Sequence, residues 1–60
     1  MNISQKRDFL KLVEELAELS VELVQQLNKP TKARNKRISD EIRDVEKRLK
    51  PVKKFLTTVS

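Results

Sequence analysis

A single break, Asn28-Lys29-Pro30, divides a chain of 60 residues that contains no glycine, and apolar residues recur with helical period on each side of it. Proline cannot continue a helix that precedes it, so the first helix is predicted to end near Asn28. Asn2 or Ser4 can cap its start, and Thr31 or Asn35 can cap a second helix. Because tight β-hairpins need residues with positive φ, the lack of glycine also argues against strands. The pattern predicts an all-α fold, an antiparallel helical hairpin.

The two halves carry opposite charge, which favours the antiparallel arrangement. Residues 1–28 have a net charge of −2, from three basic and five acidic side chains, and residues 29–60 have +7, from eleven and four. Pro51 is expected to kink or end the second helix, because proline lacks the N–H group and its ring clashes with the preceding turn. Residues 51–58 are then expected to form a short third helical segment with Pro51 at its first position.

The apolar residues of the first helix spread too far around it for one neighbour to cover. On a wheel of about 100° per residue they occupy an arc of roughly 200°, wider than the stripe of an ordinary surface helix: Phe9, Leu10, Leu12, Val13, Leu16, Ala17, Leu19, Val21, Leu23, Val24 and Leu27. The second helix has a narrower seam, with spacings of three and four, formed by Ile38, Ile42, Val45, Leu49, Val52 and either Phe55 or Leu56. A homodimer or homotetramer in the form of a helix bundle would cover the wide arc.

Composition excludes several kinds of site. The chain has no cysteine and no histidine, so Cys/His zinc sites, Ser-His-Asp triads and cysteine nucleophiles are ruled out. Without glycine there is no phosphate-binding P-loop. No apolar run approaches the roughly 20 residues of a membrane span, and no signal peptide is visible. We therefore expect one small domain, residues 1–60, in the cytoplasm and without a membrane partner.

Two pairs of carboxylates are the candidate chemical groups. Glu15-Leu16-Ala17-Glu18 is an E-x-x-E motif, and Glu41-Ile42-Arg43-Asp44 is an E-x-x-D motif. A spacing of three residues places both members of a pair on one helix face. In an antiparallel hairpin the middles of the two helices lie side by side, so the four carboxylates can converge. Clusters made only of oxygen ligands suit hard cations such as Mg²⁺.

The runs Val13-Glu14-Glu15-Leu16-Ala17-Glu18-Leu19 and Asp40-Glu41-Ile42-Arg43-Asp44-Val45 together resemble the MazG-like all-α nucleoside triphosphate pyrophosphohydrolases. The resemblance covers about residues 6–56 and implies a single MazG-like helical domain that works as a dimer or tetramer. It implies that Glu15, Glu18, Glu41 and Asp44 bind Mg²⁺, which holds a triphosphate while water attacks phosphorus. The expected products are a nucleoside monophosphate, ribo or deoxy, and pyrophosphate.

Neighbouring charges supply further candidates. Glu14 is a candidate catalytic residue beside the ligands, and Lys36, Arg37 and Arg48 are candidate contacts for the substrate phosphates. Arg37 and Arg48 bracket Glu41 and Asp44 along one stripe of the helix. The same stripe can also be read as two salt bridges on a solvated surface. The alternative function is a non-catalytic basic hairpin oligomer that binds nucleic acid or a partner protein, which would explain the five positive charges of residues 29–37.

Overall fold

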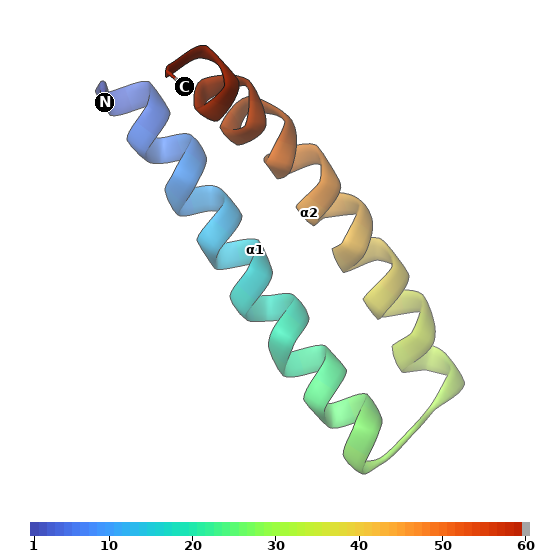
Figure 1. The fold of residues 1–60 in the computed structure, drawn as a ribbon. Helices are drawn as coiled ribbons and strands as arrows, with labels where there is room; N and C mark the ends of the chain where they lie inside the picture. Colours follow the sequence, from blue (N-terminus) through green and yellow to red (C-terminus); the bar gives the residue numbers. More distant parts are fainter. Residues whose placement is uncertain (60) are drawn as a thin grey trace.

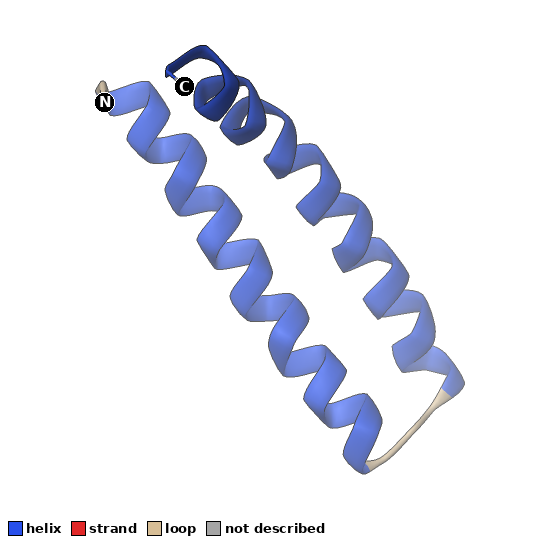
Figure 2. Cartoon of the chain, viewed as in Figure 1, coloured by secondary structure: helices blue, strands red, loops and turns tan. Residues whose placement is uncertain are grey.

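The computed structural model describes residues 1–59 and contains two long helices packed side by side. Helix α1 comprises Ile3–Asn28 and helix α2 comprises Lys32–Val59. They run antiparallel, so both termini lie at one end of a rod that measures 41 × 17 × 14 Å (Figure 1). A short loop joins the helices at the other end, and no strand occurs in residues 1–59 (Figure 2). The predicted all-α hairpin is confirmed.

Helix α1 begins and ends where its sequence signals predict. The Asn2 side chain accepts a hydrogen bond from the Gln5 backbone N–H at 2.8 Å, and the Gln5 side chain accepts one from the Asn2 N–H at 2.9 Å. This reciprocal capping box satisfies two backbone donors that the first helical turn leaves free. Asn2 rather than Ser4 is therefore the cap. At the other end the Lys29 N–H still donates to the Gln25 carbonyl at 2.8 Å, before the chain turns at Pro30.

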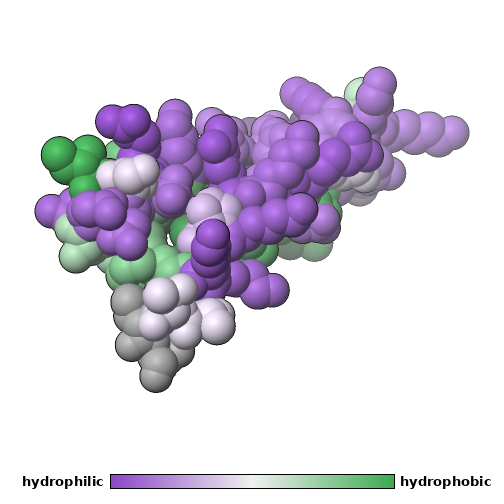
Figure 3. All heavy atoms as spheres, turned by 90° about the horizontal axis from the view of Figure 1, so that it is seen from above, coloured by the Kyte–Doolittle hydropathy of each residue, from purple (hydrophilic) through white to green (hydrophobic). Residues whose placement is uncertain are grey.

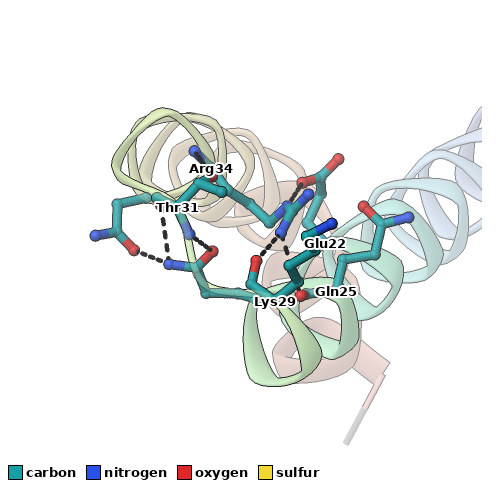
Figure 4. Close-up of polar contacts among 7 residues, drawn as sticks. Glu22, Gln25, Lys29, Thr31 and Arg34 are labelled. Carbon is teal, nitrogen blue, oxygen red and sulfur yellow. Dashed lines mark hydrogen bonds and ion pairs between the residues drawn. The ribbon is translucent and has the colours of Figure 1, made fainter.

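Side chains from both helices form hydrogen bonds that hold the loop in place (Figure 4). Thr31 caps α2, since its hydroxyl accepts from the Arg34 N–H at 3.1 Å. The Gln26 amide exchanges hydrogen bonds of 3.1 Å with the Thr31 N–H and carbonyl. The Arg34 guanidinium donates to the Lys29 carbonyl, and at 3.2 Å to the Gln25 carbonyl. These contacts satisfy carbonyls at the end of α1 and fix how α2 leaves the loop, which sets the register of the two helices.

The expectation that α2 ends at Pro51 is wrong, because α2 continues through this proline to Val59. No separate third segment forms over residues 51–58. The residues that follow Pro51 pack on α1: Val52 is 5% exposed, and the Phe55 ring meets the Phe9 ring edge-on at a centroid distance of 5.5 Å. This packing holds the residues on both sides of the proline in one helix and offsets the lost backbone hydrogen bond.

The contact between the helices is a narrow seam. Its buried side chains are Leu12 of α1 with Val45 and Val52 of α2, and Phe9, Leu19 and Leu49 pack against them. Ile42, which was predicted for the seam, is instead exposed, and Phe55 rather than its alternative Leu56 takes the last position. Glu41 is half-buried in place of Ile42. The helices otherwise meet along the predicted line, at Val45, Leu49 and Val52, and the exchange at this one position brings a carboxylate into the contact.

Candidate metal centre

The spacing of the seam places carboxylates of both helices against each other at mid-hairpin. On α1 the half-buried positions follow intervals of three and four residues, which is the pattern of a helix that packs along one neighbour. Glu15 and Glu22 occupy two of these positions, and Glu41 occupies one on α2. Three acidic side chains therefore lie in or beside the contact, where apolar residues would be usual. A hairpin that places carboxylates there must hold them close together.

Glu15, Glu18 and Glu41 form a compact group of carboxylates. Each offers one oxygen, and the three oxygens lie within 4.8 Å of one another. Glu15 and Glu41 are half-buried, whereas Glu18 is exposed at the edge of the group. The predicted convergence of the E-x-x-E and E-x-x-D motifs across the two helices is thus present for three of the four acids.

Glu41 is the most perturbed member of the group. Its Oε2 atom is buried and accepts no hydrogen bond. Burial raises the pKa of the Glu41 carboxyl above its ordinary value, and the negative charges of Glu18, Glu15, Asp44 and Glu22 raise this pKa further. A buried carboxylate oxygen without a partner is costly. A cation placed among these oxygens would remove both the missing contact and the repulsion.

Asp44 borders this group on the side toward the chain termini. With Glu15, Lys47 and Arg48 it lines a surface hollow of about 340 Å³. We call Glu15, Glu18, Glu41 and Asp44 the acidic cluster. Two cations thus adjoin the cluster, and one of them, Arg48, was predicted to contact phosphate. Lys36 and Arg37, the other predicted phosphate contacts, are exposed on α2 and are not among the residues that line the hollow.

The ion pairs in residues 1–59 leave the acidic cluster uncompensated. Lys11 Nζ lies 3.9 Å from Glu14 Oε2, and Arg34 Nε lies 3.9 Å from Glu22 Oε2. Neither pair includes a member of the cluster. Glu14 faces solvent with about half of its side chain exposed and lies outside the three-carboxylate group, so its catalytic role stays a prediction.

Sequence reasoning did not assign a role to Glu22, Arg34 or Lys47. Glu22 follows Glu15 by seven residues, which is two helical turns on the same face, so the spacing alone could have placed it at the seam. Arg34 lies within the basic run that was read as a general polyanion site. In the structure its side chain instead joins Glu22 to the loop carbonyls (Figure 4).

The donor set fits a hard divalent cation. In an octahedral Mg²⁺ site with ligand distances of about 2.0–2.1 Å, bound oxygens lie about 3–4 Å apart, so the three carboxylates need only small side-chain movements to share one ion. Oxygen ligands alone, with no nitrogen or sulfur ligand nearby, favour Mg²⁺ or Mn²⁺ over Zn²⁺. The buried and unpartnered Glu41 oxygen is the feature that such an ion would satisfy.

Comparison with known proteins adds no relative. No family model matches the chain, and neither curated proteins nor solved structures gave a significant match. Within residues 1–59, neither helix has the length and apolar character required to cross a membrane.

Proposed function

We propose that this protein is a Mg²⁺-dependent nucleoside triphosphate pyrophosphohydrolase, which converts a (d)NTP and water to a (d)NMP and pyrophosphate. The observation that carries the proposal is the convergence of Glu15, Glu18 and Glu41 from two helices, with their oxygens within 4.8 Å. It occurs in the pair of motifs that resembles the MazG-like enzymes. Asp44 at the border of the group completes the set of four acids that this resemblance implies.

In this proposal the acidic cluster holds the metal, and the adjoining cations hold the substrate. Glu15, Glu18, Glu41 and Asp44 supply the protein oxygens, and bound Mg²⁺ neutralises the triphosphate and polarises the phosphoryl group that reacts. Lys47 and Arg48, which line the hollow beside Asp44, donate hydrogen bonds to phosphate oxygens. The protein thus positions a polyanion that its carboxylates would otherwise repel.

The reaction needs no histidine or cysteine. A water oxygen bonds to the α-phosphorus and its proton passes to the solvent, while the bond from this phosphorus to the bridging oxygen breaks and pyrophosphate leaves with the electron pair. Catalysis of phosphoryl transfer depends mainly on positioning and on neutralising charge. Carboxylates, lysines and arginines are sufficient for both, and they are what this chain provides at the site.

The test is pyrophosphate release from a panel of NTPs and dNTPs, with and without Mg²⁺. We expect release by the wild type only with the metal, and a loss of at least about 100-fold in Glu41→Gln, since even the partners that orient metal ligands are worth 10–100-fold. The matched control is Glu46→Gln, the same substitution at an exposed glutamate of α2, which should keep its activity.

Two results would contradict the proposal. One is the absence of pyrophosphate release from every nucleotide by a chain that circular dichroism shows to be helical. The other is equal activity in wild type and Glu41→Gln. If the folded chain released no pyrophosphate and instead bound polyanions with an affinity that falls steeply with salt, the non-catalytic basic hairpin would take its place.

A further inference from the structure

The hairpin has an apolar face that its own helices do not cover. Large apolar side chains on it are between 42% and 83% exposed. We define the apolar face by these residues: Leu10, Val13, Leu16, Leu23, Val24 and Leu27 of α1, with Ile42 and Leu56 of α2. Seen from the end that carries both termini, polar residues cover the upper and right-hand parts of the surface, while apolar ones appear toward the left and below (Figure 3).

Along α1 the middle of this face is a regular stripe that is nearly the same in both directions. It reads Leu10, Val13, Ala17, Ser20, Val24, Leu27, with intervals of three, four, three, four and three residues. Such intervals keep a row of side chains in line with a neighbouring helix. The stripe extends about 25 Å at 1.5 Å per residue. Leucines stand at its two ends, valines stand one position inward from each end, and the two central residues have small side chains.

This symmetry identifies the occupant as a second copy of α1. When two copies run antiparallel about an axis between Ala17 and Ser20, Leu10 meets Leu27 and Val13 meets Val24. At the axis Ala17 meets Ser20. In a two-fold interface both subunits use the same surface, which must therefore be complementary to itself. This stripe meets that requirement. The small central pair lets the helices approach closely, while the larger residues fill the space on either side of it.

Charge and area agree with self-association. Glu14 flanks the stripe, and antiparallel pairing about this axis sets it beside Val21 and not against another acidic side chain. A standard interface takes about 800 Å² from each partner, out of a surface of 4971 Å² here. Among residues 1–58 only Leu12, Val45 and Val52 are buried, and a hairpin with so small a core needs more apolar burial to be stable.

We propose that two copies of this chain pack through the apolar face, with their α1 helices antiparallel about Ala17 and Ser20. Ile42 and Leu56 of α2, which are exposed on the same face, extend the interface. The acidic cluster lies on the other side of the α1–α2 seam, so each copy keeps its own cluster open to solvent. This arrangement rests on the apolar surface alone and holds whether or not the cluster binds a metal.

The first test is the mass in solution by light scattering, for wild type, Ser20→Glu and Ser4→Glu. Both serines are exposed on α1, but only Ser20 lies in the stripe. We expect wild type and Ser4→Glu to have twice the chain mass of 7.1 kDa. Ser20→Glu should have a single-chain mass or require at least about tenfold more protein to pair. A wild type of single-chain mass, or a Ser20→Glu variant that pairs as well as wild type, overturns the proposal.

A second measurement reports the orientation even if Ser20→Glu fails to fold. The chain has no cysteine, so single introduced thiols can be cross-linked with a short bifunctional reagent. A mixture of Leu10→Cys and Leu27→Cys should yield the mixed cross-linked pair, whereas Leu10→Cys alone, or mixed with the α2 surface variant Ser39→Cys, should not. Efficient cross-linking of Leu10→Cys to itself would contradict the antiparallel arrangement.

Discussion

The two sides of the α1–α2 seam differ in what they lack. On one side Glu15, Glu18 and Glu41 lie within 4.8 Å of one another, and none of them forms an ion pair among the residues that the structure describes. On the other side leucines, valines and an isoleucine are exposed. A single register of the two helices produces both sides, because the rotation that brings Glu41 into the seam turns Ile42 out of it. A cation bound on one side and apolar cover on the other would each supply what that side lacks.

The largest expected effect comes from the seam that separates the two sides. Leu12→Ala should lower the free energy of unfolding by about 2–5 kcal/mol, since it truncates one of the three side chains that are buried among residues 1–58. A core this small supplies only about 3–5 kcal/mol, so the variant should be largely unfolded at room temperature. Urea unfolding followed by circular dichroism measures this loss.

The matched comparison is Leu27→Ala, which truncates a leucine that is 83% exposed at the end of the apolar face. It should cost less than Leu12→Ala, and its cost should appear mainly as a greater dependence of stability on protein concentration. An equal loss from both variants at every concentration would contradict the view that the seam and the apolar face play different parts.

The next effect concerns the acidic side and its dependence on pH. The pKa of Glu41 is raised in the folded chain, by burial first and then by its acidic neighbours, so between the unfolded and folded values the folded chain binds more protons. Without divalent cations the stability contributed at Glu41 should therefore be present at low pH and be lost as pH rises through the folded pKa. Glu41→Gln should lack this loss and melt at a higher temperature than wild type at neutral pH.

Melting curves from about pH 3 to pH 7 measure this difference. Glu46→Gln, at an exposed position of the same helix, controls for the change in net charge. If Glu46→Gln raised the melting temperature as much as Glu41→Gln does, general charge and not the acidic cluster would be responsible. Adding Mg²⁺ should reverse the order, since a bound cation stabilises the wild type alone.

The smallest expected change in stability comes from a residue that belongs to neither the acidic cluster nor the apolar face. Asn2→Ala removes the capping box at the free end of α1 and should cost about 1 kcal/mol of stability. Because Asn2 touches neither the acidic cluster nor the apolar face, the rise in melting temperature on adding Mg²⁺ should stay as in wild type. A diminished response to Mg²⁺ would show that the cluster depends on overall stability more than on its own geometry.

The sequence was sufficient to predict what is local. It placed the end of the first helix at Asn28 and narrowed the caps to Asn2 or Ser4 and to Thr31 or Asn35, because caps and a proline act within a few residues. The approach of Glu15 and Glu18 to Glu41 also follows from two motifs at the middles of antiparallel helices. Packing across the hairpin was harder to predict, as the uninterrupted helix at Pro51 shows. There the contact of Phe9 with Phe55 and the burial of Val52 override a strong local signal.

The seam of α2 shows the same limit. Spacings of three and four allow two lines along this helix, one with Ile42 and Leu56 and one with Glu41 and Phe55. Apolarity favours Ile42 over Glu41 and leaves Phe55 and Leu56 both open, whereas the structure turns Glu41 and Phe55 inward. The choice depends on which side of α1 faces inward and on the loop contacts of Gln26 and Arg34, which no pattern within α2 contains.

The most direct test of the central claim is a calorimetric titration of the folded protein with Mg²⁺, for wild type, Glu41→Gln and Glu46→Gln. If the acidic cluster is a metal centre, wild type and Glu46→Gln bind one or two ions per chain, and Glu41→Gln binds at least about tenfold more weakly. Equal affinity in all three proteins, or no binding to the folded wild type, would contradict the account.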